Sequence, residues 1–304
     1  MPRLSIIVPH RHEDSRLEAT LLSLLENRPD DSEIIVVHDG SYSDPYNLVD
    51  EVIFIEEDPS SKTLKLINAG VMAACSPAVC VLLDGAIVTD GWSEAALSTL
   101  LESETAAVAV AVQTSRGQTS HGIDARILSR PNFAQAGRVE ASSAQAECIG
   151  PVLACGFYRR KVLLALGGWN EELDEQAADV ELALALGSLG LACQFDASTL
   201  VAHAAQSRKL TSAAWKQLAS LVAAHGLVAT SWGNSLKSLL GGCLQGRMFT
   251  AAAWGAGLRD ASTIRRTQLR MNHARQQFPQ DSTQQSLRLH LGNGSSASQR
   301  RRAA

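Results

Sequence analysis

VCVLLDGAIVTDGW, residues 79–92, begins with an apolar run that ends at Asp84. A short apolar run that stops at a polar turn is typical of a buried strand. Two residues after Asp84, where a second acid would complete an Asp-x-Asp sequence, the chain has Ala86. The stretch therefore predicts a strand that ends in one carboxylate, which is either part of an incomplete metal site or the cap of a turn.

Strand and helix signals alternate on both sides of this stretch. Strands are predicted at Leu4–Val8, Glu33–Val37, Val52–Ile55, Ala78–Leu83 and Ala106–Val112, and helices at Leu17–Leu25, Lys62–Cys75 and Trp92–Leu101. Continuous apolar strands that alternate with helices predict an α/β fold, a mostly parallel Rossmann-like sheet covered on both faces.

The later part of the chain has a weaker pattern. Residues 113–150 are rich in Ser, Gln and Gly and are expected to form a long excursion from the sheet. Regular structure is expected again at Val152–Leu166, in a helix at Ala178–Leu189, and in the strand-like segments LACQF and TLVAH, residues 191–195 and 199–203.

Polar residues stand at the ends of three predicted strands. Pro9 and His10 follow the first strand, His38 and Asp39 follow the second, and Asp84 follows the strand quoted above. Ligands of open parallel sheets bind outside the carboxyl ends of the strands. We therefore expect these side chains to belong to one binding site.

The charges divide the chain into segments. Residues 1–206 hold 13 Lys and Arg against 29 Asp and Glu, and residues 207–304 hold 14 against 2. We expect one α/β domain at 1–206, a basic helical segment at 207–279, and a Ser-, Gln- and Arg-rich tail at 280–304 that is disordered.

The basic segment has an apolar stripe at helical spacing. The stripe consists of Trp232, Leu236, Leu239, Leu240, Cys243 and Leu244. Such a helix either packs against the acidic domain or lies on an anionic membrane surface or acceptor. No recognition motif accompanies the charge, so nucleic acid is not an expected partner.

Composition points to the cytoplasm. The apolar run before Pro9 is too short for a signal peptide, and no apolar stretch reaches the length of a membrane span. The six cysteines have no metal-type spacing and are expected to be buried free thiols. We expect a cytoplasmic protein that can associate with a membrane through its basic segment.

Several segments, taken in order, resemble family 2 glycosyltransferases, which have the A-type nucleotide-sugar-binding fold. The matching segments are SIIVPHRHED (5–14), LEATLLSLL (17–25), EIIVVHDGSYSDP (33–45), INAGVMAA (67–74), VLLDGAIVTDGW (81–92), GGWNEEL (167–173) with the helix after it, and TLVAH (199–203). Their order and spacing carry the resemblance, which covers about residues 3–206.

The resemblance implies transfer of a sugar, with inversion, from a nucleotide-diphosphate donor to a hydroxyl of a glycan or lipid-linked acceptor, as in polysaccharide biosynthesis. It also implies the residues that contact the nucleotide: Pro9, His10, His38, Asp39, Asn68 and Asp84. From the residues alone, Asp39 and Asp84 are also typical of turns after strands, and Asn68 of a solvated helix position.

A divalent cation, Mg²⁺ or Mn²⁺, normally neutralises the leaving diphosphate. The resemblance implies Asp84 and His203 as its ligands, with Ala86 in place of the second acid. A methyl group cannot ligate a cation, so either the metal is held weakly, with help from diphosphate oxygens and water, or metal-assisted catalysis has been lost. We expect weak metal dependence, and Ala86→Asp should strengthen metal binding. A single histidine after a strand is otherwise most often structural.

Asp179 is the acid that the resemblance implies as the catalytic base, although Ala178 replaces the Glu that precedes it in the family. The acceptor side is implied to include Gly168, Trp169 and Glu181. From the residues alone, Asp179 is also typical of a helix start, and Trp169 of a core.

Two other functions compete with glycosyl transfer. Loss of acids from three motifs favours a catalytically inactive relative that binds a nucleotide, a sugar or a partner enzyme. A nucleotidyltransferase would have a glycine-rich basic loop after the first strand, and PHRHED, residues 9–14, contains no glycine.

Overall fold

A computed structural model describes residues 2–124, 138–140, 148–204 and 261–278, together with Gln217, Leu218, Ser220, Leu221, Ala224 and His225. The apolar stripe of the basic segment, between Trp232 and Leu244, and the tail at 280–304 lie outside the described residues. Among the residues described, no helix is both long enough and apolar enough to cross a bilayer.

The first half of the chain alternates strands and helices as the sequence predicts. Its elements are β1 (Leu4–His10), α1 (Asp14–Glu26), β2 (Ser32–His38), β3 (Val52–Glu56), α2 (Thr63–Ala73), β4 (Ala78–Leu82), β5 (Ala86–Ile87), α3 (Glu94–Glu102), β6 (Ala107–Thr114) and β7 (Thr119–Asp124). The predicted elements have the right type, with ends that differ by at most three residues.

The second half adds short strands, helices and one long strand. Its elements are β8 (Arg138–Glu140), β9 (Cys148–Gly150), β10 (Cys155–Arg159), α4 (Arg160–Leu166), α5 (Glu175–Ser188), β11 (Cys193–His203) and α9 (Ala261–Gln277). Part of the expected excursion at 113–150 is therefore sheet, because β7 pairs with β6, β8 and β9.

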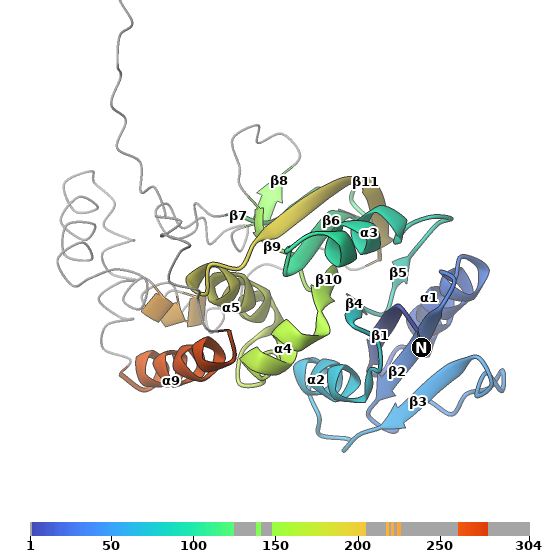
Figure 1. Cartoon of the computed structure of the whole chain (residues 1–304). Helices are drawn as coiled ribbons and strands as arrows, with labels where there is room; N and C mark the ends of the chain where they lie inside the picture. The colour runs from blue at the N-terminus through green and yellow to red at the C-terminus, as the bar shows by residue number, and fades with distance from the viewer. Residues whose placement is uncertain are drawn as a thin grey trace, which may run out of the picture.

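The strands form one mixed sheet in the order β3-β2-β1-β4-β10-β6-β11-β5. β1 runs parallel to β2 and β4, β2 to β3, and β6 to β11. β10 is antiparallel to both β4 and β6, and β5 is antiparallel to β11. Figure 1 shows this sheet crossing the molecule with helices beside it. The mostly parallel sheet with flanking helices is the fold class that the sequence predicts.

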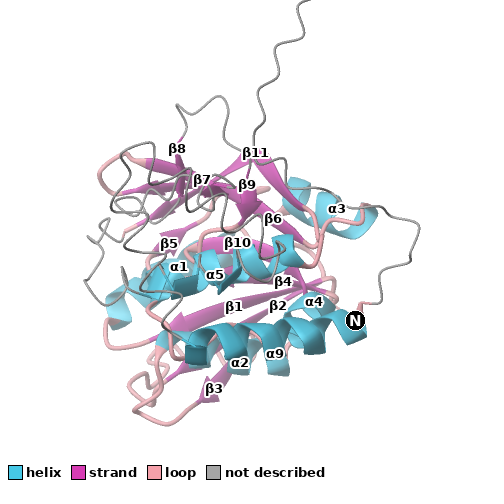
Figure 2. Cartoon of the chain, turned by 90° about the vertical axis from the view of Figure 1, so that its left-hand side faces the viewer, coloured by secondary structure: helices cyan, strands magenta, loops and turns pink. Residues whose placement is uncertain are grey.

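Successive side chains of a strand point to opposite faces of the sheet, so the sheet contributes to two hydrophobic cores. In β1, Ile6 and Val8 belong to a buried cluster that includes Leu21 of α1, while Ile7 belongs to a second cluster with Leu66 of α2. Figure 2 shows α2, α4 and α9 along one face of the sheet. Each fully buried aliphatic side chain contributes about 1.5–3 kcal/mol relative to an exposed one. The strands are thus held from both faces.

Helix α5 starts earlier than the predicted Ala178. Asp174 is its N-cap and accepts a hydrogen bond from the backbone N of Gln176. Every residue from 177 to 186 is buried, so the helix has no polar face to mark its start. The two predicted segments LACQF and TLVAH are one strand, β11, whose register shifts between Asp196 and Leu200.

Candidate active site

The ends of β1, β2 and β4 lie together at the carboxyl edge of the sheet. His10 pairs with His38 at the last position of the β1–β2 ladder, and Asp84 follows β4 by two residues. Pro9 is buried and lies beyond the last pair between β1 and β4, so its missing N–H removes no ladder bond on that side. The three strand ends that the sequence singles out are neighbours in the fold.

His10 joins two of these elements. Its fully buried ring lies 3.1 Å through Nδ1 from Oδ2 of Asp84, and 3.1 Å through Nε2 from Oδ1 of Asp14 at the start of α1. Burial lowers the pKa of His10, but the hydrogen bonds and charges of Asp84 and Asp14 outweigh burial, and the pKa is raised above 6.5. A protonated ring can donate to both carboxylates at once.

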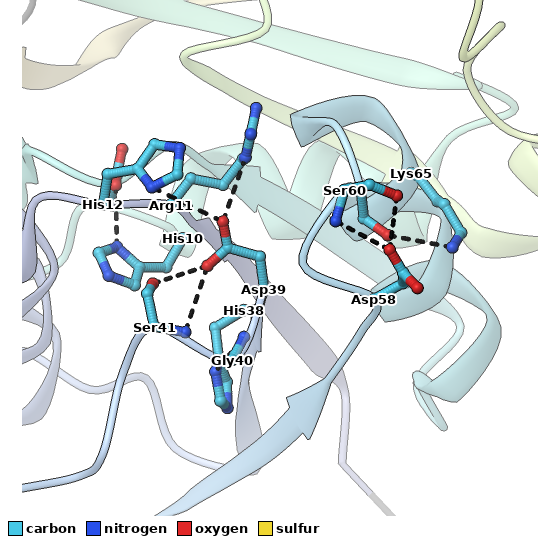
Figure 3. Close-up of polar contacts among 12 residues, drawn as sticks. His10, Arg11, His12, His38, Asp39, Gly40, Ser41, Asp58, Ser60 and Lys65 are labelled. Atoms are coloured by element: carbon cyan, nitrogen blue, oxygen red, sulfur yellow. Dashed lines mark hydrogen bonds and ion pairs between the residues drawn. The ribbon is translucent and has the colours of Figure 1, made fainter.

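Asp39, directly after β2, is buried, and both of its carboxylate oxygens accept hydrogen bonds. Its Oδ1 accepts hydrogen bonds from Oγ of Ser41 at 2.6 Å and from the Ser41 backbone N at 3.3 Å. Its Oδ2 accepts from Nε of Arg11 at 3.4 Å and lies 3.8 Å from Nδ1 of His12. Figure 3 shows Arg11 and His12 on one side of the carboxylate and Ser41 on the other.

The charge of Asp39 is favoured by these neighbours. Burial raises its pKa, but the hydrogen bonds from Ser41 and Arg11 and the charge of His12 lower the pKa below 3.8. Asp39 is therefore an ionised acceptor at neutral pH. It is held in place by the loop that follows β1.

His38 forms part of an aromatic wall beside Asp39. Its Nδ1 accepts a hydrogen bond from the backbone N of Gly40 at 3.2 Å, and its ring contacts Tyr42 and Phe54 edge-on. Burial lowers the pKa of His38, and this effect prevails over the charge of Glu56. The ring is thus neutral at pH 7, with its proton on Nε2.

Asn68 of α2 binds the loop that precedes α5. Its Oδ1 accepts from the Trp169 backbone N at 2.8 Å, and its Nδ2 donates to the Trp169 carbonyl at 2.9 Å and to Glu171 at 2.9 Å. The expected contact between Asn68 and a nucleotide stays a prediction. What the structure shows is a two-way clamp on the loop containing Gly168 and Trp169.

Gly168 and Trp169 are fixed from both sides. Gly168 has a φ of +72°, and a Cβ at this position would collide with the amide of Asn68. Trp169 is only 2% exposed and packs edge-on against Tyr158, with ring centroids 5.3 Å apart. Of the two interpretations of Trp169, its burial agrees with the core position rather than a surface for sugar stacking.

Asp179 lies in the second turn of α5 and is 1% exposed. Its Oδ1 accepts from the backbone N of Val180 at 2.8 Å, and its Oδ2 accepts from the backbone N of Leu153 at 3.4 Å. Asp174, not Asp179, caps the helix. Asp179 therefore faces the segment between β9 and β10 from inside the fold.

Glu181, two residues further along α5, belongs to a buried ion pair. Nη1 of Arg270 in α9 donates to its Oε2, and Nε2 of His225 lies 3.7 Å from its Oε1. Burial raises the pKa of Glu181, but Arg270 and His225 overcome this effect and lower the pKa to about 2. The place of Glu181 on the acceptor side stays a prediction. In the fold, its carboxylate binds Arg270 and thereby attaches α9 to α5.

Arg270 also donates to the carbonyls of Leu166, through Nε at 2.7 Å, and of Gly168, through Nη2. One guanidinium therefore joins the end of α4, the loop after it and α5. The two alternatives for the helix with the apolar stripe, Trp232 to Leu244, stay predictions, because those residues lie outside the described part of the chain.

The residues at the expected metal site offer few ligands for a divalent cation. Ala86 is 0% exposed and lies directly opposite His203 in the β5–β11 pair, so the two side chains share a face. Asp84 is already bonded to His10. Among the described residues no three His, Cys, Asp or Glu side chains are grouped so that they could hold a metal. This donor set does not fit a tightly held divalent cation.

Sequence reasoning missed Arg11, His12, Asp14 and Arg270 as members of these networks. The first three belong to PHRHED, whose run of ionisable residues directly after a strand was a usable signal. Arg270 had no such signal, because it lies 89 residues from Glu181 along the chain.

The family description "Glycosyl transferase family 2" matches residues 5–166. A solved structure of GalNAc-T7 with UDP, GalNAc and Mn²⁺ is similar with a TM-score of 0.56 and 13% identity, over 73% of this chain and 47% of that one. The chain thus spans about half of that protein's length. At this identity the similarity shows the fold, which agrees with the A-type fold expected from the resemblance.

Two further solved structures are similar at lower scores. Mannosyltransferase PcManGT from Pyrobaculum calidifontis, in complex with GDP-Man and Mn²⁺, has a TM-score of 0.47 and 17% identity, over 92% of this chain and 88% of that one. S. aureus TarS 1-349, in complex with UDP, has a TM-score of 0.49 and 15% identity, over 73% and 65%. No curated protein matches the chain.

Proposed function

Because the chain belongs to glycosyl transferase family 2, we propose that it transfers a sugar, with inversion, from a nucleotide-diphosphate donor to an acceptor hydroxyl. The donor binds at the carboxyl edge of β1, β2 and β4. UDP or GDP-Man in the similar solved structures supports a donor of this class.

One observation carries the proposal. Two hydrogen-bonded acids that follow different strands, Asp39 and Asp84, are bonded to the end of β1 and the loop after it, through Arg11 and His10. The strand ends are therefore one polar surface at the edge where ligands of α/β sheets bind. Asp39 is suited to accept hydrogen bonds from a ribose or a base, since its charge persists at neutral pH.

The reaction is a single displacement at the anomeric carbon. The acceptor oxygen attacks from the face opposite the diphosphate, the bond between the anomeric carbon and the phosphate oxygen breaks, and the diphosphate leaves with the electron pair. The hydroxyl proton passes to a carboxylate, for which we propose Asp179. A carboxylate is a suitable base because it is ionised at neutral pH and can reach one hydroxyl.

No step of this reaction is assigned to a divalent cation. Among the described residues, Asp84 and His203 would be its side-chain ligands, and Asp84 is bonded to His10. The acceptor is proposed to be a glycan or lipid-linked hydroxyl. A location at the cytoplasmic membrane surface stays a prediction, because the apolar stripe that would support it lies outside the described residues.

The experiment is a transfer assay with a panel of UDP-, GDP- and dTDP-sugars and the variant Asp179→Asn. The variant keeps the size and one of the two acceptor oxygens but removes basicity, so turnover should fall by about 10²–10⁴-fold. Nucleotide affinity should stay within about twofold of wild type. Asp174→Asn is the matched control, because it makes the same change at the helix cap and retains capping. Full turnover in Asp179→Asn would assign the base elsewhere.

A second candidate is a protein that binds a nucleotide sugar without transferring it. The burial of Asp179 and its two backbone hydrogen bonds favour this function, since such a carboxylate has acceptors already occupied. Wild-type protein that binds a nucleoside diphosphate and shows no transfer with any donor would select this candidate.

A further inference from the structure

The basic residues at the donor edge are concentrated in one short segment. Residues 10–16, HRHEDSR, connect β1 to the first turn of α1 and hold two histidines and two arginines. The side chains of Arg11 and Arg16 are 32% and 39% exposed. Both guanidiniums can therefore reach a ligand from solvent without any change in the core.

Arg16 lies at the turn where the family has its second acid. The backbone N of Gly85 donates to the Arg16 carbonyl at 3.3 Å and to Oγ1 of Thr20 at 2.8 Å. Gly85 has a φ of +84°, and a Cβ built on it would lie 3.4 Å from Cδ of Arg16. The arginine side chain thus passes directly over the Asp84-Gly85-Ala86 turn.

Arg11 lies at the other acid of the edge. Its Nε donates to Asp39, and Figure 3 shows the side chain extending past that carboxylate. A guanidinium has five N–H donors, and this bond uses one of them. Arg11 and Arg16 therefore stand beside Asp39 and the Asp84 turn, the two places where the donor is proposed to bind.

We propose that Arg11 and Arg16 neutralise the diphosphate of the donor in place of a divalent cation. The inference rests on the proposed function, because it names how that donor is bound. Guanidinium groups suit this task, since their planar donors match phosphate oxygens and they remain charged at every physiological pH. The Ala86 methyl removes a metal ligand at the same turn that Arg16 covers.

The present partners of the two arginines do not prevent this role. Arg16 pairs with Glu13 at 2.5 Å, but both side chains are exposed to solvent. Exposed ion pairs contribute little to stability, so a diphosphate with more negative charge can compete for the guanidinium. The Arg11–Asp39 bond is long at 3.4 Å and leaves room for a shared contact.

The test is calorimetric titration with UDP, GDP and dTDP, each in EDTA and in MnCl₂, on wild type, Arg11→Gln and Arg16→Gln. Uridine, guanosine and thymidine serve as probes without phosphate. Arg3→Gln is the matched control, because Arg3 is exposed and precedes the opposite end of β1. Arg16→Lys tests whether charge alone is sufficient, and melting temperatures check that each variant is folded.

We expect at least one diphosphate to bind wild type in EDTA, with an affinity that MnCl₂ changes by less than about twofold. Each glutamine variant should bind it about tenfold more weakly or worse, as expected for loss of a charged hydrogen bond. Nucleoside binding should be unchanged in Arg16→Gln, diphosphate binding should be unchanged in Arg3→Gln, and Arg16→Lys should recover part of the loss.

Binding that requires MnCl₂ would overturn this inference and leave the proposed function standing. Unchanged diphosphate affinity in both glutamine variants would do the same. Absence of binding for every nucleotide, with and without MnCl₂, would overturn the proposed function and this inference together.

Discussion

The donor edge and the segment around α5 contain the two halves of the candidate site, and their charged groups are held differently. At the donor edge, Asp39 accepts from the partly exposed Arg11, and Asp84, itself partly exposed, is bonded to the buried ring of His10. Around α5, Asp179 and Glu181 are buried and held by backbone groups and by Arg270. The first region can exchange partners for a ligand at little cost, whereas the second is built as a rigid support.

This comparison shows that two charged residues of one helix can be equally buried and still have different partners. Asp179 and Glu181 are two residues apart, yet one accepts from backbone groups and the other anchors a helix from the C-terminal region. Buried ion pairs are costly to break, because the remaining charge has no partner. We therefore predict large losses of stability for substitutions around α5 and small ones at the donor edge.

The largest effect is expected from Arg270→Gln. It leaves the carboxylate of Glu181 buried with only His225 nearby and removes two bonds to backbone carbonyls. The free energy of unfolding, measured with urea, should fall by about 3–5 kcal/mol. Arg275→Gln is the control, since Arg275 is exposed on the same helix. Equal stability of the two variants would remove the distinction between the two regions.

Acid should destabilise the wild type more than a variant that lacks the ion pair between Glu181 and Arg270. The pKa of Glu181 is lowered in the fold from 4.5 to about 2, so its stabilising effect is complete above pH 4.5 and is lost as the pH falls toward 2. A shift of this size corresponds to about 3 kcal/mol. Urea unfolding of wild type and Glu181→Gln between pH 7 and pH 2 measures it. A wild-type curve parallel to that of the variant would show that the pair contributes nothing.

Gly168→Ala should destabilise the loop before α5 more than Gly167→Ala does. Both glycines have a φ of +72°, so each substitution incurs the left-handed strain of about 1–2 kcal/mol. A Cβ at Gly168 also collides with Asn68, whereas a Cβ at Gly167 meets no atom within 4 Å. Thermal unfolding should therefore show about 1–3 kcal/mol of additional loss for Gly168→Ala. An equal loss of stability in both variants would mean that Asn68 can move aside and is not held rigidly.

Most of the sheet could be predicted from the sequence, because β1, β2, β4 and β6 are local apolar runs that end at polar residues. The expectation that the carboxyl ends of parallel strands meet at one edge of the sheet also placed His10, Asp39 and Asp84 correctly near one another. β8 and β9 were missed because each has three residues and pairs with β7 across a long sequence separation. A pattern of two or three residues cannot distinguish such strands from loops.

The partners of the predicted residues were harder to foresee than the residues themselves. Asn68 was expected at a nucleotide and is found clamped to the Trp169 backbone, 101 residues away. Such contacts depend on how α2 and α4 pack, which no local pattern encodes. Residue type still predicted that these side chains would be hydrogen-bonded, as Asn68, Asp39 and Asp84 are.

The smallest effect is expected from Ala86→Asp at the donor edge. The new carboxylate would lie opposite His203 and near Asp84, so Mn²⁺ affinity should rise by about tenfold. Calorimetry with Mn²⁺ and a bound nucleoside diphosphate measures it, with Ala86→Asn as a control of equal size and weaker ligation. Equal affinities in the two variants would mean that position 86 does not face the cation.

The most direct measurement of the central claim is hydrogen exchange of the amides with and without saturating UDP, GDP or dTDP. We expect at least one of the three nucleotides to increase the protection of peptides covering residues 9–16, 38–42 and 83–88. Peptides from α5, residues 175–188, should keep the protection that they have without nucleotide. No protection with any of the three nucleotides, or protection confined to 166–188, would contradict it.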